Sequence, residues 1–217
     1  MAYGPKIEAI HNDGVQMTLR EPTNAEQELA PFFPAPEQVS QYTVKRIQGY
    51  LAQETPAAFV ANVLDNSQLI NWGVYVKDAG ADVAQLVGTA GVHEPDENGR
   101  SWLYAYLLNP HEHGRQFGRR ASRLVVAAAF VTQSALEEMV TFVNPANEPG
   151  LKVAEHIGMA LDSSYAGNQC RFTVPREATW PWLRQAGPHV SGQVHAVTRA
   201  LGGDDALVVT LSRSPQP

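Results

Sequence analysis

A polar, glycine-containing loop in the middle of the chain has the residue types that bind phosphate. Residues 113–118 read HGRQFG, and an apolar stretch with helical spacing follows at once. The first amides of a helix have no partner within the helix, and the helix dipole is positive there, so such a junction attracts anions. Gly114 and Gly118 let the backbone approach a ligand closely, and Arg115 supplies a cation suited to phosphate. Taken alone the loop predicts only an anion site, because strand–glycine–helix junctions are common in α/β proteins.

Positive charge gathers around this loop although the chain as a whole is acidic. The formal net charge is −6 at pH 7, yet four arginines fall within nine residues: Arg115, Arg119, Arg120 and Arg123. A basic island of this kind is usually a solvated helix face, and its sharper interpretation is a site for a polyanionic small molecule. The net charge and the lack of a DNA-binding motif argue against a nucleic-acid partner.

Other reactive residue types give weaker signals. His111 and His113 are two residues apart with no third ligand nearby, which is poor spacing for zinc, so no metal is expected. The single cysteine, Cys170, excludes an intramolecular disulfide and is interpreted as a small buried side chain in a strand. The most apolar stretch, residues 124–131, is far shorter than the roughly 18 residues that span a bilayer, and no secretory signal is visible. These features predict a cytoplasmic protein without a membrane partner.

The elements that would position the loop begin with an antiparallel meander. Alternating apolar residues and turn signals predict strands over residues 15–20, 71–77, 83–93 and 101–108. A hairpin turn is predicted at 78–82, and helix start signals and spacing predict helices over 23–30, 39–53 and 57–66.

After the loop the apolar residues change to helical spacing. Helices are predicted over 119–134 and 148–157, the second closed by Gly158, with strands over 139–143 and 170–174. A strand–helix series after a meander indicates an α/β (α+β) fold, with a mixed, mostly antiparallel sheet flanked by helices. A further helix over 190–200 and strand over 207–212 follow, in a tail that would be an edge strand, a lid or an oligomer contact.

The loop resembles motif A of the GNAT superfamily of N-acetyltransferases, in particular the branch similar to the ribosomal-protein (RimJ/RimL-like) enzymes. That branch has Pro, three residues, a Gly-basic-Gly-aromatic-Ala/Gly run and a helix reaching Ala-Phe; here Pro110 precedes GRQFG, and the helix reaches Ala-Phe at 129–130. The resemblance implies that the loop holds the CoA pyrophosphate, with cofactor contacts from His113, Gly114, Arg115, Gln116, Phe117, Gly118 and Arg119. His113 stands where Arg or Gln is usual. Gln116 stands where Gly is preferred, which is costly if its φ is positive.

Residues 143–159 resemble a second motif of the same family, in which Asn-x-x-Ser opens a helix that ends at a glycine. Asn147 and Gly158 fall at the corresponding places. The resemblance implies that the Asn147 carboxamide bonds the pantetheine arm of CoA, whereas taken alone Asn147 is simply the N-cap of the helix. Gly150, carried over as a cofactor contact, stands where relatives often have Ser near the departing thiol. Ala154 stands where other members have Tyr, so neither position offers a proton donor.

Acetyl transfer to an amine needs a neutral amine, a polarised thioester carbonyl and a fate for the thiolate. The family polarises the carbonyl with amides of the strand before motif A, a role implied here for Leu107 and Leu108. Its general base usually lies at the end of the central meander strand, where this chain has His93 and Glu94. Neighbouring residues of a strand point to opposite sides, so one of the two is expected to face the cleft. A carboxylate acting through water suits an amine substrate better, so Glu94 is the preferred base, although it is as readily a solvated turn residue. His93 keeps the advantage of a pKa near neutrality. Tyr104 is expected in the core or the cleft wall.

The resemblance spans most of residues 15–174. It implies a GNAT domain over residues 1–174 with an extension over 175–217. It also implies transfer from acetyl-CoA, as cosubstrate, to a primary amine of a protein N-terminus or a small molecule, by direct transfer in a ternary complex. An acidic protein suits a cationic acceptor. Assembly into a homodimer is a further expectation that the sequence leaves undecided. The alternative is a non-catalytic acyl-CoA-binding or interaction module on the same fold, which the departures at Gln116, Gly150 and Ala154 motivate.

Overall fold

The computed structural model describes residues 2–24, 27–28, 69–107, 114–162, 169–179, 190–201 and 205–212, and the structural statements below concern these residues. The helices predicted over 39–53 and 57–66 lie outside them, as do residues 25–26 and 29–30 of the helix predicted over 23–30.

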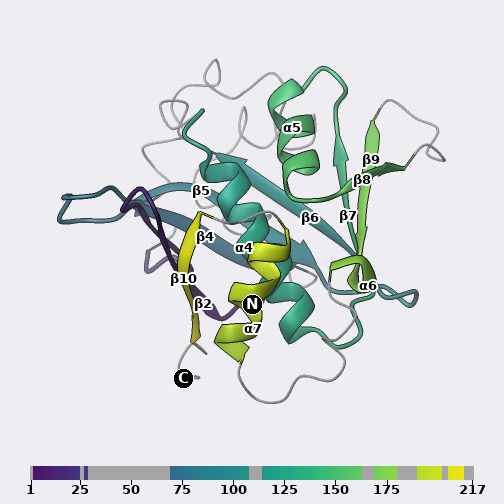
Figure 1. The fold of residues 1–217 in the computed structure, drawn as a ribbon, viewed down its shortest axis with the longest axis horizontal. Coiled ribbons are helices and arrows are strands. Elements are labelled where there is room, and N and C mark those ends of the chain that lie inside the picture. The colour runs from purple at the N-terminus through teal and green to yellow at the C-terminus, as the bar shows by residue number, and fades with distance from the viewer. Residues whose placement is uncertain are drawn as a thin grey trace.

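The described residues form a ten-stranded sheet (Figure 1) with the order β10–β2–β3–β4–β5–β6–β7–β9–β8 and with β1 (Ala2–Tyr3) paired to β4 off this path. The other strands are β2 Lys6–His11, β3 Gln16–Arg20, β4 Leu69–Lys77, β5 Gln85–His93, β6 Arg100–Leu107, β7 Glu138–Val143, β8 Ala160–Asp162, β9 Cys170–Pro175 and β10 Ala206–Ser212. Along this path every pairing is antiparallel except that of β6 with β7. The mixed, mostly antiparallel sheet predicted from the sequence is therefore confirmed.

Four helices are described alongside the sheet: α4 Phe117–Thr132, α5 Glu148–His156, α6 Arg176–Thr179 and α7 Val190–Ala200. Helix α4 packs on β5 and β6, and α7 packs on both α4 and β10. The central run of alanines and valines in α4 is buried on every side, as expected of a helix in the middle of a core. Among the described residues, no helix combines the length and hydropathy needed to cross a bilayer.

The end of α5 shows why the sequence pattern located it well. Gly158 has a φ of 80°, its amide donates to Glu155 O at 3.0 Å, and the Met159 amide donates to Ala154 O at 3.1 Å. This pair of bonds is the Schellman motif, which a glycine closes without a steric penalty. The C-cap predicted at Gly158 is confirmed.

Two local predictions need correction. Strand β2 was not predicted, because its inward positions hold Ile7, Ala9 and the polar His11, while the apolar Ile10 faces outward. The alternation that marks a half-buried strand is therefore blurred in the sequence. Cys170 does lie in a strand, at the start of β9, but it is half-buried rather than buried.

The tail completes one side of the sheet. Strand β10 pairs antiparallel with β2, from Ala206 opposite His11 to Ser212 opposite Lys6, and forms the outer strand. Val194 and Val197 of α7 are fully buried in the same core as α4. The N-terminal and C-terminal segments thus meet beside the long helix, as Figure 1 shows.

Candidate functional site

The parallel pair β6 and β7 defines the place where a ligand site can form. Their register covers three pairs, from Arg100 opposite Glu138 to Trp102 opposite Val140, and the strands then run apart (Figure 1). Since parallel strands end in the same direction, the helix N-termini that follow them lie toward the same end of the sheet: α4 after β6, and α5 after β7. The N-termini of both helices are therefore directed to one region.

Strand β6 directs backbone groups toward the divergence. Gly99 O accepts from the Glu138 amide and Leu103 O accepts from Thr141 Oγ1, both at 3.1 Å, so the odd-numbered residues of β6 face β7. Orientation repeats every second residue of a strand, so the Ala105 and Leu107 amides point to the same side, beyond the end of the β7 register. The role of the Leu107 amide as a donor stays a prediction, and Leu108 lies outside the described residues.

The loop before α4 has a strained backbone. Gly114 has a φ of 82°, and Gln116 has a φ of 65° and a ψ of 5°, the single positive φ outside glycine among the described residues. The cost foreseen for a side chain at Gln116 is therefore present, about 1–2 kcal/mol for an L-residue in the left-handed region. His113 lies outside the described residues.

The left-handed turn opens the first turn of α4 to a ligand. Gln116 is the N-cap and makes no side-chain capping bond, and its carbonyl accepts the first intrahelical bond, from the Arg120 amide at 3.0 Å. The amides of Phe117, Gly118 and Arg119 therefore precede the intrahelical ladder. Together with the helix dipole, these three donors make an anion site.

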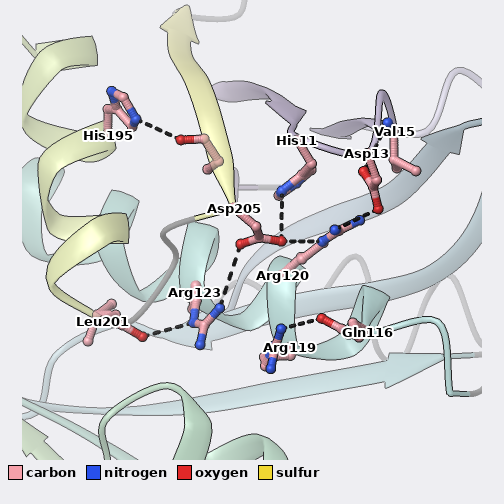
Figure 2. A network of polar contacts seen from close by, with 11 residues as sticks. His11, Asp13, Val15, Gln116, Arg119, Arg120, Arg123, His195, Leu201 and Asp205 are labelled. Carbon is pink, nitrogen blue, oxygen red and sulfur yellow. Dashed lines mark hydrogen bonds and ion pairs between the residues drawn. The ribbon is translucent and has the colours of Figure 1, made fainter. Parts of the chain in front are cut away.

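The four arginines near this turn do not act as one group. Arg115 Nη2 lies 2.5 Å from Asp78 Oδ1 in the β4–β5 turn, and its guanidinium lies 4.7 Å from the centre of the Phe117 ring. Arg119 Nη2 donates to Gln116 Oε1, so both side chains stay beside the loop. Arg120 and Arg123 are only 6% and 3% exposed and face inward (Figure 2). The solvated-face interpretation of the basic island is therefore wrong for Arg120 and Arg123.

At the N-terminus of α5, Asn147 is a helix cap. Its Oδ1 accepts from the Gly150 amide at 3.0 Å, which confirms the N-cap interpretation. A Cβ on Gly150 would lie 2.5 Å from Asn147 Nδ2 and 2.9 Å from Val143 Cγ1, so the cap itself requires glycine there. Nδ2 has no hydrogen-bond partner among the described residues, and it is left as a donor at the end of β7.

The two candidates for the base are placed differently. Val92 belongs to the core cluster shared with α4, so its neighbour His93 lies on the opposite face of β5, where its ring meets Trp102 edge-on at 5.8 Å. Glu94 follows the end of the strand and is exposed. Which of the two assists the reaction stays a prediction.

Tyr104, which the sequence placed in the core or the cleft wall, shares the face of His93 with two polar side chains that the sequence did not single out, Asn71 and Thr89. Asn71, Gly91 and Tyr104 are opposite one another on β4, β5 and β6, and a Cβ on Gly91 would lie 2.7 Å from Asn71 Oδ1 and 2.6 Å from Tyr104 Oη. Asn71 and Thr89 are 0% and 1% exposed. Their signal was faint, since each is one polar residue inside an otherwise apolar strand.

This fold has the form of an acyltransferase domain, in which helix N-termini follow a divergent pair of parallel strands. The sequence matches the family described as acetyltransferase (GNAT) domain over residues 16–160, most of the chain, and the protein therefore belongs to that family. No curated protein matches the sequence.

Solved structures share the fold at low sequence identity. RimJ of Mycobacterium smegmatis, in complex with CoA-disulfide, has a TM-score of 0.61 and 11% identity, and the match covers 95% of this chain and 99% of that one. The ribosomal-protein-S5-alanine acetyltransferase of Vibrio fischeri has a TM-score of 0.56 and 14% identity, covering 78% and 97%. MccE, the microcin C7 self-immunity acetyltransferase in complex with acetyl-CoA and AMP, has a TM-score of 0.56 and 11% identity. The match covers 73% of this chain and 92% of that one. The resemblance to the RimJ-like branch is thus confirmed at the level of the fold.

Proposed function

We propose that this protein is an N-acetyltransferase that moves the acetyl group of acetyl-CoA to a primary amine by direct transfer in a ternary complex. The observation that carries the proposal is the left-handed turn at Gln116, which leaves the three first-turn amides of α4 unpaired at the end of β6. The GNAT family match supports it, as do structural relatives whose complexes hold CoA-disulfide or acetyl-CoA.

The phosphates of acetyl-CoA would bind at the N-terminus of α4. The amides of Phe117, Gly118 and Arg119 would donate to pyrophosphate oxygens, with Gly114 allowing close approach. Arg115 and Arg119 lie beside the loop and would add charge-assisted bonds, because guanidinium donors match phosphate oxygens.

The acyl arm would lie between the diverging strands. Asn147 Nδ2, which the cap leaves as a donor, would bind a carbonyl of the pantetheine arm. The Leu107 amide, directed to the same region, would donate to the thioester oxygen and stabilise the charge that develops there. Gly150 contributes by keeping the Asn147 cap in place.

Transfer would proceed by attack of the amine nitrogen on the thioester carbon, with formation of the amide bond and departure of CoA as a thiolate. A base must remove one amine proton, and the CoA thiolate must either take up a proton or be released into solvent. His93 lies on the face that carries Asn71 and Tyr104, which supports it as the base more than the exposed Glu94. The acceptor would be a protein N-terminus or a small cationic amine, since the chain is acidic.

A non-catalytic acyl-CoA-binding module is the second candidate. Ala154 is 2% exposed within the core, and the Asn147 cap fills the space where a side chain at Gly150 would lie. Neither position therefore has a proton donor. Release of free thiol from acetyl-CoA, measured against a panel of amines and N-terminal peptides beside calorimetric CoA binding, separates the candidates. Turnover with one acceptor supports the enzyme, binding without turnover supports the module, and absence of CoA binding refutes both.

A further inference from the structure

A partly buried ion-pair cluster joins the first turn of α4 to segments near both ends of the chain (Figure 2). Arg120 donates through Nε to Asp205 Oδ2 at 2.7 Å and through Nη2 to Asp13 Oδ2 at 2.8 Å. His11 Nδ1 lies 3.3 Å from Asp205 Oδ2, and the His11 side chain is 2% exposed. We call His11, Asp13, Arg120, Arg123 and Asp205 the Asp205 cluster.

Arg123 extends the cluster by one turn of the helix. It donates through Nε to Leu201 O at 2.8 Å and through Nη2 to His156 O at 2.6 Å, and Nη1 lies 3.9 Å from Asp205 Oδ1. Asp205 therefore lies between two buried guanidinium groups. The last carbonyls of α5 and α7 meet the same helix, where a cation is favourable because of their dipoles.

The carboxylates of the cluster belong to segments outside the family match. Asp13 lies in the β2–β3 turn and Asp205 precedes β10, whereas both arginines lie inside residues 16–160. The two outer segments also bond each other, since the Asn12 amide donates to Asp205 O at 2.8 Å. The cluster thus joins residues inside the family match to carboxylates outside it.

Charges within the cluster balance. Burial lowers the pKa of His11, and the Arg120 charge lowers it further, against smaller opposing effects of Asp205 and Asp13. Burial raises the pKa of Asp205, but the hydrogen bond from Arg120 and the charges of His11 and Arg120 outweigh it, so this pKa lies below its ordinary value. Two carboxylates thus compensate two guanidinium groups, and removal of one partner leaves a buried charge unpaired.

The Asp205 cluster holds the first turn of α4, whose amides would bind phosphate, through the side chain of Arg120. Arg120 is the first residue whose amide joins the intrahelical ladder, directly after the unpaired amides of residues 117–119. The β2–β3 turn also rests on the β4–β5 turn, where a Cβ on Gly14 would lie 3.0 Å from Ala79 Cβ, and the β4–β5 turn in turn holds Arg115. The loop is therefore held from two directions.

We propose that Asp205 is a positioning residue of the cofactor site: through Arg120 it fixes the first turn of α4 in the orientation in which its free amides bind phosphate. This inference rests on the proposed binding of acetyl-CoA. Donors bind a phosphate well only when their backbone is held before the ligand arrives, so a loosened first turn weakens binding.

The test compares Asp205→Ala with Val209→Ala, which trims a buried side chain of β10, the strand that follows Asp205. Asp205→Ala is expected to weaken CoA binding, measured by calorimetry, about tenfold, within the range of coupling between sites. The KM for acetyl-CoA should rise with it, while kcat at saturating acetyl-CoA is retained. Val209→Ala should leave both constants unchanged. Asp205→Asn should restore part of the affinity, because its amide oxygen still accepts from Arg120.

Two further measurements keep the inference open to refutation. Asp13→Asn removes the charge of the second carboxylate, whose side chain is 46% exposed, and a smaller loss in the same direction is expected even if Asp205→Ala fails to fold. Hydrogen exchange of the amides at 117–120 should quicken in Asp205→Ala but not in Val209→Ala.

Unchanged or tighter CoA binding in Asp205→Ala and Asp13→Asn would overturn the inference, and tighter binding would show that the carboxylate charge dominates. If the wild-type protein binds no CoA, the proposed function fails instead. The hold on the first turn is then judged by exchange alone, and unchanged exchange would overturn it as well.

Discussion

Replacement of Gly150 by Ser, the residue that related enzymes often have, should disrupt the start of α5. The new Cβ would stand 2.5 Å from Asn147 Nδ2 and 2.9 Å from Val143 Cγ1, where no side chain fits without movement. Displacement of Asn147 costs the N-cap, about 1 kcal/mol. The remaining overlap with Val143 costs about 1–2 kcal/mol. We expect Gly150→Ser to lower the free energy of unfolding by about 2–3 kcal/mol.

Thermal and urea unfolding measure this loss, which corresponds to a fall in Tm of about 5–10 °C for a domain of this size. Gly150→Ala serves as a control and should lose nearly as much, since the clash begins at Cβ. In Asn147→Ala the cap is already gone, so adding Gly150→Ser there should cost only the overlap with Val143, about 1–2 kcal/mol. Additive losses in the double mutant, or an unchanged Tm in Gly150→Ser, would refute the placement of Asn147 against Gly150.

Three further outcomes are expected. Arg176→Met should lower the free energy of unfolding by about 3 kcal/mol in urea titrations, because its guanidinium donates to two carbonyls after α4, each at 2.5 Å; a loss below about 1 kcal/mol, the range of surface substitutions, would contradict this role. The pKa of His11 is lowered from 6.5 in the folded state, so stability should fall as pH drops below 6.5. The lowered pKa of Asp205 adds a second loss of stability below its ordinary value of 3.8. When urea midpoints are measured across pH, the first of these two losses should be absent in His11→Asn. His93→Asn should shift the pH–rate profile of acetyl transfer while CoA affinity is kept, and Glu94→Gln should not; the reverse pattern would assign the base to Glu94.

Most of the regular structure was predictable because it follows from short-range rules. Periodicity located β4, β5, β7, β9, α4, α5 and α7 to within about two residues, the usual uncertainty of such bounds. Strand β2 escaped because its alternation is broken by one inward histidine and one outward isoleucine. The pattern of a strand this short depends on only a few residues.

The candidate site divides in the same manner. The anion loop, the strained Gln116 and the Asn147 cap were all predictable, since each is set by residues within one turn of a helix. The polar row of Asn71, Thr89 and Tyr104 was not, because it forms only when three strands lie side by side.

By itself, the sequence determined that a glycine-containing loop and a helix N-terminus follow a strand and that a capped helix follows the next strand. Only the tertiary structure decided which arginines remain beside the loop. Arg120 finds its partners 85 and 107 residues away, at Asp205 and Asp13, and the pairing of β10 with β2 brings these carboxylates together. Propensity and spacing act over a few residues, whereas the environment of a charge depends on which distant segments the fold packs against it.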